Sequence, residues 1–297
     1  MSTAQRADEP VLVTGATGLH GGAVTRALLA ANRRVRAFTR DPAGPRGRWL
    51  SKLGAEVITG DLLDTESLTS AMQGTSAVYA VTTPFSVGPE GEIEQGEHII
   101  AAAREAQLTW LILASVASAD RSTGIPHFES KARIEQQLRA SHISHTIVAP
   151  TYFYENLGDP AQIVAGGELA LPISASRPLQ QVAVADLGAL VAALLGRRED
   201  FLGQRVEVAG DQPTPQQMAD VLSAAGNRNV DYRQIDFDTR NSDIAAMYRY
   251  LEQTGYQVDI PTLHSRFSEV QWTSFTDWAR QRFTPDALNE RRRGDHT

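Results

Sequence analysis

The chain has 297 residues, of which 42% are apolar, a net charge of -7 and no cysteine. This composition excludes disulfides, thiolate catalysis and cysteine-ligated metals, and it argues against a broad nucleic-acid-binding surface. The sequence has no apolar run of eighteen residues to span a bilayer and no signal-peptide core at its start, so we expect a soluble, cytoplasmic protein that meets no membrane.

The first predicted element is a strand at 11–14, which runs into a loop containing Gly15, Gly18 and Gly21. Apolar residues then recur with helical spacing from Ala23 to Ala31. A tight turn needs residues without a Cβ, and the backbone N–H groups at a helix N-terminus attract phosphate. This order of strand, glycine loop and helix predicts a dinucleotide site, although such loops also occur in ordinary strand-to-helix turns.

The second predicted strand, at 34–40, ends with an arginine. NAD-selective sites place an acidic residue near this point for the ribose 2′-hydroxyl, whereas an arginine accommodates the 2′-phosphate of NADP. Here the strand ends with Thr39 and Arg40, and Asp41 comes only after them. We interpret Arg40 as a ligand of the 2′-phosphate, the alternative being a solvated arginine at a strand end.

Strands and helices alternate through most of the remaining chain. A loop at 41–52 leads to a short helix, and further strands are predicted at 56–59, 77–82, 109–115, 146–150 and 205–209. Helices are predicted at 65–74, with Asp64 as a candidate cap, and at 92–106, 127–141 and 187–195. This alternation predicts an α/β fold with a parallel sheet. Residues 152–180 are predicted to form a segment that leaves the sheet and faces the substrate. Helical patterns near 215–225, 239–254 and 274–283 predict a smaller, mostly helical C-terminal lobe.

Histidine and aromatic residues provide weaker signals. His142 and His145 have a spacing that could begin a metal site, but no third ligand follows them, so we expect no metal. Five aromatic residues either line an apolar pocket or belong to the core, and the sequence does not distinguish between these two interpretations. They are Phe85, Tyr152, Phe153, Tyr154 and Tyr248. A further group is expected to pack within the C-terminal lobe: Trp272, Phe275 and Trp278.

Several short motifs stand in a specific order along the chain. They are Val13–Gly21, Val35–Arg40, Gly60–Asp61, Ala80–Thr82, Glu94–Gly96, His127–Lys131, Pro150 with Glu155–Leu157, and Val184–Leu187. In this order and spacing, the sequence resembles the NmrA-like branch of the atypical short-chain dehydrogenases/reductases, over about residues 11–285.

The resemblance implies a Rossmann-type, doubly wound parallel sheet with helices on both faces, and NADP(H) as the cofactor. The nucleotide-binding domain would span residues 1–153 and 181–210, the substrate lobe 154–180 and 211–285, and a flexible tail 286–297. The residues implied at the phosphates are Gly15, Thr17, Gly18, Leu19, His20, Gly21 and Arg40. Those implied along the adenine, ribose and nicotinamide are Asp61, Leu62, Val81, Thr82, Thr83, Lys131, Pro150, Tyr152 and Phe153.

The same resemblance raises a question about catalysis. Classical members use a tyrosine four residues before the lysine, but here the pair is His127 and Lys131. One helical turn separates them, and a histidine titrates near neutrality, so His127 is a candidate acid or base; the alternative is a polar surface histidine. The position of the family's active-site serine falls on Val116, with Ser115 and Ser118 beside it.

Two functions follow from these observations. The first is an NADPH-dependent reductase that delivers hydride to a small apolar or aromatic acceptor, with Lys131 and His127 as catalytic residues. The second is a non-catalytic NADP(H) sensor that acts through a protein partner. We expect a monomer or homodimer, and the negative charge opposes a DNA-binding role.

Overall fold

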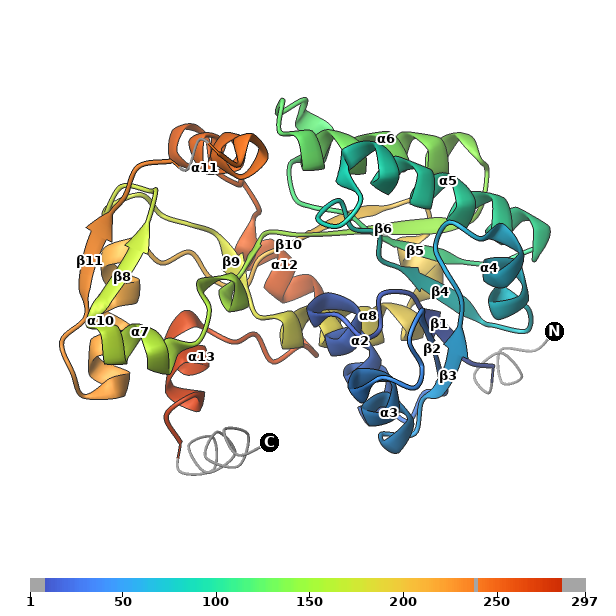
Figure 1. Ribbon diagram of the computed structural model, residues 1–297, viewed down its shortest axis with the longest axis horizontal. Coiled ribbons are helices and arrows are strands. Elements are labelled where there is room, and N and C mark those ends of the chain that lie inside the picture. The colour runs from blue at the N-terminus through green and yellow to red at the C-terminus, as the bar shows by residue number, and fades with distance from the viewer. Residues whose placement is uncertain (1–8, 238–239, 285–297) are drawn as a thin grey trace. The chain divides into compact units, whose positions relative to one another are not determined.

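The computed structural model describes residues 9–237 and 240–284, which form two compact units (Figure 1). Of the described residues, the first unit contains 9–150, 187–208 and 267–270, and the second contains 151–186, 209–237, 240–266 and 271–284. Residues 151–153, 181–186 and 209–210 therefore lie outside the unit to which the sequence assigned them, and so do 267–270. The predicted tail at 286–297 lies outside the described residues.

A seven-stranded sheet forms the centre of the first unit, in the order β10-β6-β5-β4-β1-β2-β3. Its strands are β1 (Val11–Val13), β2 (Val35–Thr39), β3 (Glu56–Thr59), β4 (Ala77–Ala80), β5 (Leu111–Ala114), β6 (His145–Pro150) and β10 (Arg205–Val208). Every neighbouring pair is parallel, as the alternation of strands and helices predicts. All seven carboxyl ends consequently lie at one edge of the sheet.

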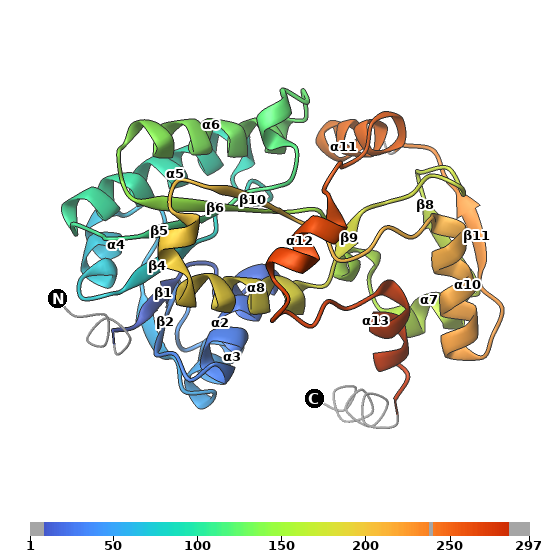
Figure 2. The same cartoon turned by 180° about the vertical axis from the view of Figure 1, so that it is seen from behind.

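Helices cover both faces of this sheet (Figures 1 and 2). One face carries α2 (Leu19–Ala30), α3 (Pro45–Lys52) and α8 (Val184–Gly196), and the other carries α4 (Thr65–Met72), α5 (Gly88–Glu105) and α6 (Pro126–Ala140). A Cβ on Gly188 of α8 would lie 2.8 Å from the carbonyl oxygen of Ala23, so glycine lets α8 approach α2 closely. The fold is the predicted doubly wound arrangement.

The packing explains the apolar patterns of the sequence. All residues of β4 and β5 are buried, which fits strands covered on both faces. Beneath α4, α5 and α6, side chains from the sheet and the helices form one core, which includes Leu12, Phe38, Leu68, Ile99, Leu111, Ile134 and Leu138. The Asp64 carboxylate accepts hydrogen bonds from the N–H groups of Glu66 and Ser67, and so caps α4 as predicted.

The second unit contains more strands than the sequence predicts. β7 (Tyr152–Phe153) pairs with β9 (Gln181–Val182), and β8 (Glu168–Leu171) pairs with β11 (Asp231–Gln234), both in parallel. The helices are α7 (Pro160–Gly166), α10 (Pro215–Gly226), α11 (Ser242–Gln253), α12 (Ile260–Arg266) and α13 (Phe275–Gln281). α10, α11 and α13 match the predicted helices, although residue 239 lies outside the described residues.

Short elements complete the chain: the 3-10 helices η1 (Ala119–Arg121) and η2 (Tyr154–Leu157), and α9 (Arg198–Phe201). In the described part of the chain, no helix has both the length and the apolar character needed to cross a membrane.

Aromatic side chains occupy two different environments. Tyr154 is fully buried in the second unit, where its ring contacts Phe275 and Trp278 and its hydroxyl donates to the Thr273 carbonyl at 3.1 Å. Tyr154 is therefore a core residue. Phe85, in the first unit, is 75% exposed and is therefore not a core residue.

Candidate functional site

The glycine loop connects β1 to α2 at the carboxyl edge of the sheet. Thr14 joins its start to the end of β4, because the Thr14 hydroxyl accepts from the Val81 N–H at 2.7 Å and donates to the Val81 carbonyl at 3.0 Å. Gly15 has a φ of +60°, and a Cβ on Gly21 would lie 2.4 Å from the Gly15 carbonyl oxygen. Only glycine fits at Gly21 without a shift of the backbone.

The N-terminus of α2 faces this loop without a side-chain cap. Gly18, the N-cap residue, has no side chain to offer, and the first helical turn contains no acidic residue. A helix start carries unpaired N–H groups and partial positive charge, which suit an anion. The loop and the helix start together form a cradle of bare backbone that a Cβ would fill, and this geometry fits a pyrophosphate.

His20, in the first turn of α2, is held by a buried tyrosine. Its Nε2 lies 2.6 Å from the hydroxyl of Tyr79, and the direction of that hydrogen bond depends on the histidine tautomer. Burial, with a smaller contribution from the charge of Lys131, lowers the pKa of His20 to about 3. His20 is therefore neutral near pH 7, and what it offers a phosphate is a backbone N–H rather than a charge.

Arg40 and Asp61 follow the carboxyl ends of β2 and β3. Thr39 pairs with Thr59 in the sheet register, so the residues after each strand lie at the same edge. Arg40 is exposed, which leaves its guanidinium accessible to a phosphate. The Asp61 carboxylate accepts from the Leu63 N–H at 3.0 Å and thereby orders the turn that also contains the half-buried Leu62.

Arg46 was not predicted as a site residue. It lies in the first turn of α3, and its Nη1 donates to the carbonyl of Thr17 in the glycine loop at 3.1 Å. Thr17 itself is half-buried. Tertiary folding thus places Arg46 against the loop. The sequence signal was the arginine-rich stretch after Arg40, but it did not identify which of these arginines reaches the loop.

Lys131 extends from α6 to the end of β4. Its Nζ donates to the Thr82 hydroxyl at 2.9 Å, to the Thr82 carbonyl at 3.1 Å and to the Ala114 carbonyl at 3.3 Å, and it lies 2.9 Å from Oε1 of Glu92. Thr83 follows, and its N–H donates to Oε1 of the Gln95 side chain at 3.1 Å. The predicted residues Val81, Thr82, Thr83 and Lys131 are thus brought together at one strand end.

Glu92 is the main residue that the sequence analysis missed at this place. It is fully buried in α5, although it carries a carboxylate. The signal was present in the helical period, because Glu92 lies on the same face as the buried residues Gly96, Ile99 and Ala103.

His127 shares α6 with Lys131 but contacts different groups. Its ring centroid lies 4.8 Å from that of Phe128 and 6.0 Å from that of Phe85. Phe85 belongs to the segment between β4 and α5, just after Thr83. The half-buried His127 therefore adjoins an exposed aromatic ring beside the end of β4.

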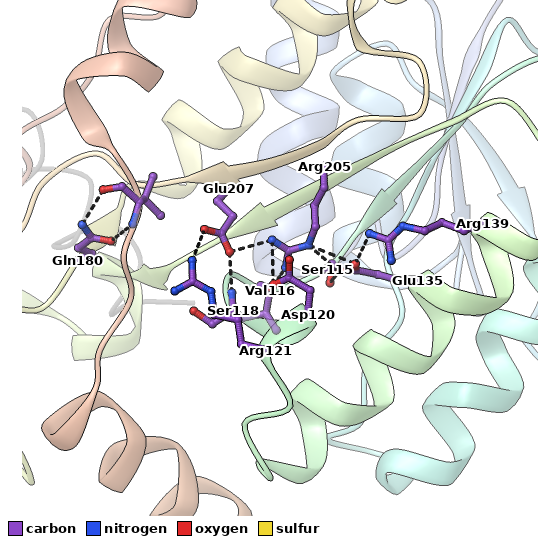
Figure 3. Close-up of polar contacts among 11 residues, drawn as sticks. Ser115, Val116, Ser118, Asp120, Arg121, Glu135, Arg139, Gln180, Arg205 and Glu207 are labelled. Atoms are coloured by element: carbon purple, nitrogen blue, oxygen red, sulfur yellow. Dashed lines mark hydrogen bonds and ion pairs between the residues drawn. The ribbon is translucent and has the colours of Figure 1, made fainter.

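The segment after β5, where the family's serine is expected, is held by a network of charges (Figure 3). The Ser115 hydroxyl donates to the buried Glu135 carboxylate of α6, while Arg205 of β10 donates to Glu135 at 3.2 Å and to the Val116 carbonyl at 2.8 Å. Glu207 accepts from Arg205 and from the Ser118 N–H, both at 2.8 Å. Ser115 is thus engaged with Glu135, and Val116 presents no hydroxyl.

Of the remaining predicted residues, Pro150 lies at the same carboxyl edge of the sheet, and Tyr152 and Phe153 belong to the second unit. Pro150 ends β6, and its carbonyl accepts from the Ala117 N–H at 2.9 Å. Tyr152 and Phe153 form β7 of the second unit, where the Tyr152 hydroxyl lies 2.9 Å from that of Tyr248. Burial, together with Tyr248, raises the pKa of Tyr152 well above its ordinary value, so this phenol stays neutral.

One cleft in the described residues lies away from the candidate site. This open cleft of about 480 Å³, lined in part by Arg104, His142 and Arg198, lies at the amino ends of β5 and β6, opposite the glycine loop. Within 9–237 and 240–284, no group of three His, Asp or Glu side chains is arranged to hold a metal ion.

Comparison with known proteins gives consistent results. A family model described as the NmrA-like family matches residues 7–279. An NmrA-like family domain-containing protein of Dictyostelium discoideum is 30% identical over 243 residues, which cover 76% of this chain and 80% of that protein.

Solved structures share the fold at lower identity. The Citrobacter sp. triphenylmethane reductase complexed with NADP(H) has a TM-score of 0.79 at 20% identity and covers 93% of this chain and 100% of its own. NmrA, a negative transcriptional regulator in complex with NADP, has a TM-score of 0.78 at 17% identity and covers 95% of this chain and 98% of its own.

Proposed function

This chain belongs to the NmrA-like family, and we propose that it is an NADPH-dependent reductase that transfers hydride from NADPH to a small apolar or aromatic acceptor. The observation that carries the proposal is the backbone cradle of Gly15, Gly18 and Gly21 at the start of α2, against which Arg46 donates to the Thr17 carbonyl. Two proteins of the same fold, one a reductase and one a regulator, are complexed with NADP(H) and NADP.

The residues at the carboxyl edge have the chemistry that NADP(H) requires. The glycine loop and the first turn of α2 would hold the pyrophosphate, while Arg40 would pair with the 2′-phosphate. Asp61 and Leu62 would lie by the adenine. NADPH, when bound, supplies the hydride.

The end of β4 would meet the nicotinamide half of the cofactor. Lys131 would bond the ribose hydroxyls, beside Val81, Thr82 and Thr83, and Pro150, Tyr152 and Phe153 would contribute on the nicotinamide side. The same edge supports the choice of acceptor. Because Phe85 is 75% exposed and its ring lies 6.0 Å from that of His127, it offers an aromatic surface to an apolar or aromatic molecule. His127 or water would supply the proton.

Titration of the purified protein with NADPH and with NADH tests the cofactor assignment. NADPH is expected to bind at least tenfold more tightly, because a charge-assisted bond from Arg40 to the 2′-phosphate contributes about 1.5–3 kcal/mol. Arg40→Ala should weaken NADPH binding and leave NADH binding unchanged. The matched control is Arg133→Ala, on an exposed position of α6, which should alter neither. Equal affinity for the two cofactors, or an Arg40→Ala variant that keeps the preference, would contradict the assignment.

A non-catalytic NADP(H) sensor is the second candidate. Two observations favour it: His127 replaces the catalytic tyrosine, and Ser115 donates its hydroxyl to Glu135. NADPH oxidation with a panel of quinones, azo dyes and triphenylmethane dyes separates the two functions. Turnover that is lost in His127→Phe while NADPH still binds would support the reductase. Tight NADPH binding without turnover by any acceptor would support the sensor.

A further inference from the structure

The ion pair between Glu92 and Lys131 is enclosed in the first unit. The Glu92 side chain is 0% exposed and that of Lys131 is 11% exposed, and Nζ lies 2.9 Å from Oε1. Each oxygen of Glu92 has another donor, because Oε1 accepts from the Thr82 hydroxyl at 3.0 Å and Oε2 accepts from the Ser130 hydroxyl. The carboxylate is thus fully paired, by groups from β4's end and from α6.

A buried ion pair of this kind is a poor device for stability alone. Removing two charges from water costs about as much free energy as their attraction returns, and apolar residues of similar size often stabilise a core more. Glu92 lies on the apolar face of α5, where such a residue would fit the pattern. Its carboxylate is better explained by the place to which it directs the ammonium group of Lys131.

That place is the end of β4. Glu92 and Thr82 bind the same ammonium group, and Gln95, three residues after Glu92 in α5, accepts from the N–H of Thr83. α5 therefore supplies two polar side chains that fix the strand end and the lysine together.

We propose that Glu92 is a positioning residue, which holds the ammonium of Lys131 at the end of β4 with its counter-charge in place, where a ribose hydroxyl of the cofactor would replace the carbonyl of Thr82 or Ala114 as one of its three acceptors. The proposal rests on the proposed function, since it assigns a role at the NADP(H) site. Glu92 itself acts through Lys131.

The test is a double-mutant cycle in the full-length protein, with the NADPH dissociation constant and the melting temperature as readouts. Glu92→Gln keeps the shape: its amide oxygen can accept from Lys131 and Thr82, and its amide N–H can donate to Ser130, whose hydroxyl has another acceptor in the His127 carbonyl at 3.1 Å. We expect Glu92→Gln and Lys131→Met each to weaken NADPH binding about tenfold, and the double variant to bind no more weakly than Lys131→Met alone. Glu94→Gln, on an exposed position of the same helix, is the control and should bind as the wild type does.

Stability supplies a second, independent arm of the cycle. Lys131→Met leaves a buried carboxylate without its cation, so its melting temperature should fall well below that of the double variant, which carries neither charge. This comparison carries the test even if Glu92→Gln alone is too unstable to purify, since the double variant should regain stability without regaining affinity.

Three results would overturn the inference. The first is that Glu92→Gln binds NADPH as tightly as the wild type, and the second is that the effects of the two substitutions on NADPH affinity add. The third is a double variant that is less stable than Lys131→Met. Each of them would show that Glu92 does not act through Lys131. These outcomes leave the proposed function intact as long as the wild type binds NADPH. A wild type that does not bind NADPH would refute the proposed function and this inference with it.

Discussion

Replacing His20 with glutamine is expected to remove an acid-sensitive contribution to the stability of this protein. In the folded chain, burial and the nearby charge of Lys131 lower the pKa of His20 from 6.5 to about 3, whereas the unfolded chain takes up the proton near the ordinary value. Between these values the unfolded state binds more protons. Stability therefore rises with pH in this window, and the contribution of His20 is lost progressively as the pH falls below about 6.5.

The size of the effect follows from the same shift. A pH of 5 lies about 1.5 units below the pKa of His20 in the unfolded chain, so the imidazole is protonated there, whereas in the folded chain it is still neutral. His20 therefore lowers the free energy of unfolding at pH 5 by about 2 kcal/mol relative to pH 8. Glutamine carries no titrating group, yet its amide can still bond the Tyr79 hydroxyl that lies 2.6 Å from Nε2 of His20. The variant should lack this pH-dependent loss.

Urea unfolding of both proteins at pH 8 and pH 5 measures the difference. The free energy of unfolding of the wild type should fall by about 2 kcal/mol more than that of His20→Gln over this interval. The carboxylates titrate alike in both proteins, so their contribution to the pH dependence cancels when the two proteins are compared. Parallel losses in the wild type and the variant would refute the assignment of a half-buried, neutral His20.

Two further substitutions test the loop and the charge network. Gly21→Ala places a Cβ 2.4 Å from a backbone oxygen, so it should weaken NADPH binding at least tenfold and lower the free energy of unfolding by about 1–3 kcal/mol. Gly196→Ala, whose Cβ meets open space, should change neither quantity. Titration with NADPH and urea unfolding measure the two effects. Arg205→Met removes one of the two cations paired with the fully buried Glu135, the other being Arg139, and should cost about 2–3 kcal/mol. Arg233→Met breaks an exposed ion pair and should cost less than about 1 kcal/mol. Equal losses of unfolding free energy in the two arginine variants would contradict the role given to the buried network.

The sequence by itself determined the features that depend on neighbouring residues. The strand at Val11, the glycines of the loop and the helix after them were recognisable because a tight turn and a helix start place their demands on consecutive positions. The Asp64 cap and the alternation of strands with helices were local in the same way. From these alone, the parallel sheet and the position of the glycine loop at its carboxyl edge could be predicted.

Only the tertiary structure decided which distant groups meet. The pairing of Lys131 with Glu92, the reach of Arg46 to the glycine loop and the exposure of Phe85 depend on segments that are far apart in the chain. The sequence shows that a residue is charged or aromatic, but its partner and its burial are set by how the helices pack on the sheet. The pairing of β8 with β11 escaped prediction for the same reason, since Asp231–Gln234 is mostly exposed and gains its strand form from a partner more than fifty residues away.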